Sequence, residues 1–232
     1  MKHQLKYSRQ QLYQSCLLSM CVHIAAIPRL SYISHENSWD KCNYSFQDKF
    51  STDGTISFDT INDVIVGAFR NNTSVRMNEY PTKIAMDLFA EANDDVRVIA
   101  QNETLMYLRM SFEHKKGFIF ANKSDIIVPV VTTALWSEGD KIFSSDNESV
   151  FLENGGEYIN KICVSKDELI EYLTDDYELT DDEISFAEEL FLIKISEKVQ
   201  LVRTSFSDFI NFQSEGYEEF ISALLNFGIE VV

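Results

Sequence analysis

The sequence predicts an α+β fold: a mixed or antiparallel sheet from the first two-thirds of the chain, packed with helices, and a mainly helical, acidic last third. One observation behind this prediction is that apolar runs typical of strands concentrate before residue 155. Another is that apolar residues recur at helical spacing after that point. Strands and helices are thus segregated, which does not favour a regular βαβ architecture. We expect a single domain over 1–232; if it is subdivided, the boundary falls near 155 and the acidic helical portion covers 157–232.

The N-terminal part predicts a helix, then short strands and a β-hairpin. Residues 3–20 place apolar side chains on one face of a helix. These side chains are Leu5, Leu12, Tyr13, Cys16, Leu17 and Met20. The polar, aromatic stretch 31–50 has room for two or three short strands. The apolar runs 54–58 and 64–69 flank turn residues and predict a hairpin, in which Gly67 indicates a bulge or a close backbone approach.

The middle of the chain predicts two helices and three short strands. The first helix begins near Pro81, because the fixed φ of proline suits a first helical turn. Its apolar stripe consists of Ile84, Ala85, Leu88, Phe89 and Ala92. The second helix covers 103–112. The β-branched run 125–136 predicts a buried strand, and 141–158 predicts two short strands, with Gly155-Gly156 as a turn.

The last third predicts helices with marked starts. Ser165 and Thr180 are each followed three residues later by Glu, which is the capping-box pattern. The final helix runs from Tyr217 to Phe227 and stops at Gly228. Residues 165–190 hold eleven acids against a single base, Lys166. The plain interpretation of this stretch is two amphipathic helices with acidic, solvated faces.

Charge is unevenly distributed along the chain. Residues 1–150 carry 15 Lys and Arg against 18 Asp and Glu, whereas residues 151–232 carry 5 against 19. The last part therefore holds −14 of the total net charge of −17. An acidic surface repels nucleic-acid phosphate and anionic membranes, but it steers a basic protein partner and speeds association. We expect no nucleic-acid and no membrane partner.

Cysteine usage and the N-terminus predict a cytoplasmic protein. The cysteines are Cys16, Cys21, Cys42 and Cys163. They are too few for a disulfide scaffold in a chain of this length, so we expect reduced, mostly buried thiols. Basic residues precede an apolar run at 16–27, as in a secretory signal, but polar residues interrupt the region and no cleavage site ends it. The run is also too short to span a membrane as a helix.

Motifs for most catalytic chemistries are missing. The sequence has no Gly-rich nucleotide motif, no G-x-S-x-G elbow, and no zinc or calcium spacing, so we predict no cofactor and no metal. Glu113-His114-Lys115 has the acid-x-Lys form of metal-dependent nucleases, but such tripeptides are frequent by chance and basic grooves for phosphate are missing, so we interpret it as a solvated helix end. The turn from Trp136 to Lys141, together with Asp40, is the candidate site of an enzyme of unrecognised type. A strand-ending turn with Trp136 in the core is the structural explanation.

Four short motifs resemble a group of small acidic bacterial proteins. They are W-D-x-x-N-Y-S at 39–45, G-T-I-S-F at 54–58, I-V-G-A-F at 65–69 and T-T-A-L-W-S-E-G-D at 132–140. Over residues 30–140 the chain is similar to immunity proteins that neutralise polymorphic or contact-dependent toxins. The resemblance implies the fold and a protective binding role, and it supplies no catalytic residues. Many toxins of this kind are basic nucleases, and an acidic inhibitor suits their phosphate-binding surface.

The leading hypothesis is a non-enzymatic immunity protein that binds a basic cognate toxin domain. Binding energy concentrates in a few aromatic or charged residues, so we expect the contact at the joint between the two acidic helices. The expected contact residues are Tyr172, Asp175, Asp176, Tyr177, Glu178, Asp181, Asp182 and Glu183. One alternative is an enzyme, which predicts a deep polar pocket and displaced pKa values at Glu138 and Asp140. Another is an acidic regulatory interaction protein, and the oligomeric state stays open.

Overall fold

The computed structural model describes residues 1–34, 36–48, 52–79, 85–108, 130–195, 200–201 and 216–231. In this part of the chain the predicted α+β fold is confirmed, with a seven-stranded antiparallel sheet and a last third dominated by helices. The chain divides into two compact units. The first consists of Met1–Leu12 and Cys42–Lys161, and the second of Tyr13–Lys41 and Ile162–Val232.

Six strands of the sheet belong to the first unit. In sheet order they are β1 (His3–Ser8), β7 (Lys141–Ser144), β6 (Thr133–Glu138), β5 (Val64–Asn71), β4 (Thr52–Asp59) and β3 (Asn43–Gln47). β2 (Asn37–Asp40), which ends the order, belongs to the second unit. The predicted hairpin is the β4–β5 pair, whose register runs unbroken from Thr52 opposite Asn71 to Asp59 opposite Val64.

Gly67 marks a close approach and not a bulge. It pairs with Ile56 within the unbroken β4–β5 ladder. A Cβ atom added to Gly67 would lie 2.9 Å from Cζ of Phe69 and 3.1 Å from Cδ1 of Leu135. Neighbouring side chains therefore fill the space that any larger residue would need.

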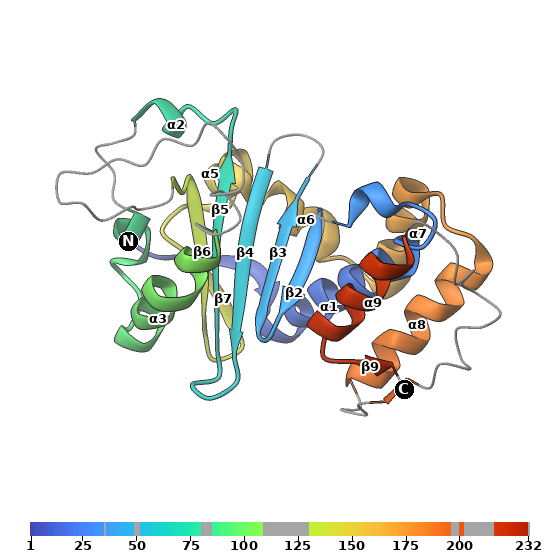
Figure 1. Ribbon diagram of the computed structural model, residues 1–232. Coiled ribbons are helices and arrows are strands. Elements are labelled where there is room, and N and C mark those ends of the chain that lie inside the picture. The colour runs from blue at the N-terminus through green and yellow to red at the C-terminus, as the bar shows by residue number, and fades with distance from the viewer. Residues whose placement is uncertain are drawn as a thin grey trace. The chain divides into compact units, whose positions relative to one another are not determined.

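Helices cover both faces of the sheet in the first unit. On one face, η2 (Ala85–Phe89), α3 (Asp94–Ile99) and the π-helical turn η3 (Ala100–Thr104) pack on β5 and β6 around the buried Trp136. On the other face lie α5 (Glu148–Phe151), the turn η4 (Leu152–Gly156) and α6 (Glu157–Ile162). There the rings of Phe46 and Tyr158 stack with centroids 3.8 Å apart. Figure 1 shows α3 in green on one side of the strands and α5 and α6 in gold on the other.

The N-terminal helix begins later than predicted. Residues 3–8 form β1, in which Leu5 and Tyr7 are buried and alternate with exposed side chains. This period of two is the strand pattern, and it precedes the helical spacing that starts afterwards. The change occurs at Ser8, whose Oγ accepts a hydrogen bond from the backbone N–H of Gln11 in the first turn of α1 (Arg9–Ala26).

The prediction of two strands over 141–158 is wrong for its second strand. Only β7 forms, and α5 follows because Asn147 caps it, its side chain accepting from the N–H of Val150 at 3.0 Å. Gly155, at a φ of 128°, then kinks the chain into α6.

Boundaries also differ in the middle of the chain. The helix predicted at 103–112 begins at Asp94, where the Asn93 side chain accepts from the N–H of Val96, and residues 109–112 lie outside the described part. Within the first predicted helix, Ala85–Phe89 form a 3₁₀ turn. Pro81, Ile84, Glu113-His114-Lys115 and residues 125–129 of the predicted strand lie outside the described residues. A short helix, α2 (Arg76–Glu79), was not expected.

The second unit is mainly helical. Beside most of α1 it contains η1 (Ser31–Ile33), α7 (Lys166–Tyr177), α8 (Asp181–Ile195) and α9 (Tyr217–Asn226), with a short parallel pair of β8 (Gln200–Leu201) and β9 (Glu230–Val231) (Figure 1). Both predicted capping boxes are present, and Gly228 follows α9 at a φ of 80°, as predicted.

α1 is buried on nearly all sides from Cys16 onward, so it is a core helix and not the helix with a single apolar face that was predicted. The four cysteines are free, as expected; three are buried and Cys42 is half-buried. None of the helices in the described part of the chain combines the length and apolar composition needed to cross a bilayer.

Candidate partner-binding site

The acidic joint, residues 175–183, connects α7 to α8 by a tight turn. Glu178 ends α7 in the left-handed conformation, with φ 52° and ψ 48°. The backbone N–H groups of Glu178 and Leu179 both donate hydrogen bonds to the carbonyl oxygen of Thr174. Thr180 then starts α8, because its N–H donates to Glu183 Oε2 at 2.8 Å and its Oγ1 accepts from the Glu183 N–H at 3.3 Å.

Arg29, in the loop after α1, forms hydrogen bonds that stabilise this joint. Its Nε donates to Glu183 Oε1 at 2.9 Å, and its Nη2 donates to Glu183 Oε2 at 3.2 Å. The same Nη2 donates to the carbonyl oxygens of Tyr177 at 2.8 Å and Glu178 at 3.1 Å. The bond to Glu183 raises the pKa of Arg29. Glu183 is only 5% exposed, so this charge partner is what permits its burial.

Tyr177 anchors the joint on its inner side. It is 6% exposed, and its hydroxyl accepts from Asn37 Nδ2 at 3.2 Å and lies 3.2 Å from His23 Nδ1. Burial raises the pKa of this phenol well above its ordinary value. Tyr177 and Glu183 were expected to contact a partner; the structure places both inside the joint, where they determine its shape.

The other six predicted contact residues lie on the outside of the same segment. The carboxylates of Asp175, Asp176, Glu178, Asp181 and Asp182 are exposed, and Tyr172 on α7 is 37% exposed. Within the described residues, no Lys or Arg forms an ion pair with Asp175, Asp181 or Asp182. The structure therefore brings five acids together as one exposed surface.

Three of these acids occupy unfavourable positions. Asp175 and Asp176 lie in the last turn of α7, which carries no base, and Glu178 is its C-cap. The carboxyl end of a helix is the negative end of its dipole, and each charge there costs about 0.3–1 kcal/mol. Glu178 also adopts a backbone conformation that favours Gly. By contrast, Asp181 and Asp182 in the first turn of α8 suit the positive end of that helix.

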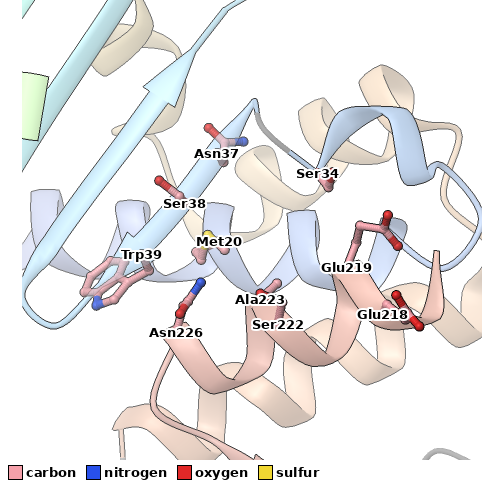
Figure 2. Close-up of a pocket in the computed structure, with 10 residues that line it drawn as sticks. All are labelled: Met20, Ser34, Asn37, Ser38, Trp39, Glu218, Glu219, Ser222, Ala223 and Asn226. Carbon is pink, nitrogen blue, oxygen red and sulfur yellow. The ribbon is translucent and has the colours of Figure 1, made fainter. Parts of the chain in front are cut away.

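A groove of about 430 Å³ lies between β2 and α9 in the same unit, as Figure 2 shows. Its lining residues are Met20, Ser34, Asn37, Ser38, Trp39, Glu218, Glu219, Ser222, Ala223 and Asn226. Asn37 belongs both to this groove and to the hydrogen bond that holds Tyr177. Tyr32 lies on η1, two residues before Ser34, and its side chain is 68% exposed.

Sequence reasoning missed Arg29, Asn37, Tyr32 and the groove. Arg29 follows a proline in a short polar loop, and no local pattern connects it to Glu183 far along the chain. Tyr32 is an exposed aromatic residue in a stretch that reads simply as loop or strand. Contacts of this kind depend on tertiary packing, which periodicity does not report.

The alternative site at the Trp136–Lys141 turn is a tight connection between β6 and β7. The Glu138 carboxylate pairs with Lys2 and accepts from Trp136 Nε1 at 3.1 Å, and the bond from Lys2 lowers the pKa of Glu138. Trp136 is buried in the core, as the structural explanation predicted. Asp40 belongs to the other unit.

No group of three or more His, Cys, Asp or Glu side chains suited to holding a metal ion occurs among the residues that the structure covers. Comparison of the chain with protein-family models, with curated proteins and with solved structures found no match.

Proposed function

We propose that this chain is a non-enzymatic immunity protein that binds a basic toxin domain through the exposed acids of the acidic joint. The observation that carries the proposal is that these acids lower the stability of the helix end where they lie. Asp175, Asp176 and Glu178 destabilise the end of α7, yet the chain keeps them on its surface. Violations of local stability rules concentrate at functional sites, where another requirement outweighs stability.

The rigidity of the joint supports a binding role. Buried contacts of Arg29, Tyr177 and Glu183 fix the turn before any partner arrives. A surface fixed in advance loses less conformational entropy on binding. Clustered exposed charge also attracts an oppositely charged partner over a distance and raises the association rate. Tyr172 supplies an aromatic contact beside the acids.

The resemblance to toxin-immunity proteins is what suggests a toxin as the basic partner. Its four motifs lie on β2, β3, β4, β5 and β6, where most of their side chains are buried. They therefore describe a scaffold, whereas the acids proposed to bind lie outside the range of the resemblance. This division is consistent with a scaffold that carries a partner-specific surface.

Protection in living cells tests the proposal first. The C-terminal domain of the protein encoded immediately upstream is the suspected toxin, and it is induced with and without this chain. We expect the chain to restore viability and to form a complex on purification. Death in both cultures, with no complex formed, would remove the immunity role for this partner.

A charge-reversed variant then locates the surface. In D175K/D176K/E178K the bases suit the end of α7, but the variant loses the attraction between Glu178 and Arg29, so urea denaturation first checks that it is folded. We expect its association rate with the toxin domain to fall by at least about tenfold and to depend less on salt. The control E103K/E153K/E157K makes the same change in net charge at exposed positions of the first unit. Equal association rates for the two variants would reduce the acidic joint to a solvated surface.

A further inference from the structure

The groove between β2 and α9 has an apolar floor and an acidic end. Met20 and Trp39, which are 2% and 4% exposed, form its floor, and the half-buried Ala223 lies beside them. In Figure 2 the carboxylates of Glu218 and Glu219 lie toward the end marked by Ser34, and Trp39 and Asn226 lie at the opposite end. Both glutamates are exposed, and within the described residues neither forms an ion pair.

These glutamates have a structural role that does not account for the groove. They occupy the first turn of α9, which has no side-chain cap, so their charge stabilises the helix start. A helix start of this kind requires only solvent around it. Here it borders a cavity of about 430 Å³ that is lined by three serines and two asparagines as well. That volume lies near the lower end of the range for ligand sites, and it suits one or two side chains.

We infer that the groove takes an arginine or lysine side chain from an extended basic segment of the partner. Such side chains combine an apolar stem with a charged head. The stem lies along Ser222 and Ala223 above the floor formed by Met20 and Trp39, while the head reaches Glu218 and Glu219, whose carboxylates accept charge-assisted hydrogen bonds. An anionic occupant meets two negative charges and is disfavoured.

Asn37 connects this groove to the acidic joint. It is one of the residues that line the groove, and its side chain donates to the Tyr177 hydroxyl, which is held at the inner side of the joint. Both surfaces are therefore built on one set of buried contacts within the second unit. The identity of the occupant rests on the proposed function, because a basic toxin domain supplies the basic segment.

The test uses a model peptide and the two tryptophans as reporters. The probe is Ac-Gly-Arg-Gly-Arg-Gly-NH2, and its neutral control replaces each arginine with citrulline. We expect the indole N–H signal of Trp39 to shift saturably with the arginine peptide, with a dissociation constant on the order of 1 mM. The signal of Trp136, in the core of the first unit, should stay fixed. The citrulline peptide should cause no saturable shift.

Two variants test whether the glutamates are responsible. E218Q/E219Q should lower the affinity for the arginine peptide by on the order of tenfold. D175N/D176N, which removes the same charge at the joint, should leave the Trp39 titration unchanged. S222R places a tethered guanidinium one helical turn after both glutamates and should block the peptide. Equal titrations of the natural chain and E218Q/E219Q, or equal binding of citrulline, would overturn the inference.

The toxin domain separates this inference from the proposed function. Loss of affinity for the toxin in both E218Q/E219Q and D175K/D176K/E178K would support both. Full affinity in E218Q/E219Q, with loss only in the joint variant, would overturn the inference and leave the proposed function standing. Binding of the arginine peptide without any toxin complex would support the groove as a cation site and remove the immunity role.

Discussion

Replacing Arg29 with alanine should destabilise the second unit by about 2–3 kcal/mol. The substitution removes four hydrogen bonds to the joint and leaves the Glu183 carboxylate, which is 5% exposed, without its charge partner. Removing one member of a fully buried ion pair costs about 3–5 kcal/mol. The Arg29 side chain is 38% exposed and Glu183 keeps its bond from the Thr180 N–H, so the cost is smaller here.

Urea denaturation measures this loss as a change in the free energy of unfolding at constant m-value. A double-mutant cycle with E183Q isolates the pair and should give a coupling of about 1–2 kcal/mol. Substitution of Arg9, whose side chain pairs with the exposed Asp63 in the first unit, is the matched control and should cost less, because solvent screens this pair. A decrease in the free energy of unfolding below about 0.5 kcal/mol for R29A, with no coupling to Glu183, would refute the conclusion that Arg29 stabilises the joint.

Three further outcomes are expected. E178G should raise the free energy of unfolding by about 0.5–1 kcal/mol in urea titrations, because glycine adopts the left-handed conformation without strain; a loss of stability would contradict this. G54A should lower it by about 1–3 kcal/mol, since the added Cβ would meet two aromatic rings at 2.6 Å, and a neutral effect would show that the rings move freely. Burial raises the pKa values of the Cys16 and Cys21 thiols, so the folded state retains protons that the unfolded chain releases above about pH 8.5. The free energy of unfolding should therefore fall by about 1.4 kcal/mol per thiol for each further pH unit. C16A/C21A should remove most of this slope between pH 9 and 10, and an unchanged slope would assign it to other groups.

Local sequence patterns predicted the elements whose causes are local. The β4–β5 hairpin follows from two apolar runs around turn residues, and the starts of α7 and α8 follow from their capping boxes. The strand at 3–8 was missed because Leu5 also fits the helical spacing of the residues after it. The helix after β7 was missed because the segment 141–158 was interpreted as two short strands, and the capping position of Asn147 was not recognised.

The outside of the joint could be predicted and its inside could not. The helical spacing of the apolar residues placed the acids on solvated faces, where the structure has them. The sequence did contain a signal for Tyr177, since Leu169, Leu173 and Tyr177 recur every four residues and form the buried stripe of α7. Glu183 was named both as a cap and as a contact, and the capping role is the one its burial supports. Arg29 and Asn37 act across long sequence separations and leave no local pattern.

Stability and binding are expected to oppose each other at the end of α7. The exposed Asp175, Asp176 and Glu178 weaken this helix end, while Arg29 offsets part of the cost by donating to the last carbonyl oxygens. Substitutions that relieve the strain or the charge, such as E178G, should therefore stabilise the fold and slow association with a basic partner. Stabilising changes elsewhere, on the solvated faces of the first unit, should leave association unaffected. Acids that serve only solubility can lie anywhere on the surface. A slower association that results from substitutions at this helix end, and not from the same substitutions elsewhere, is therefore the result that separates a binding surface from a solvated one.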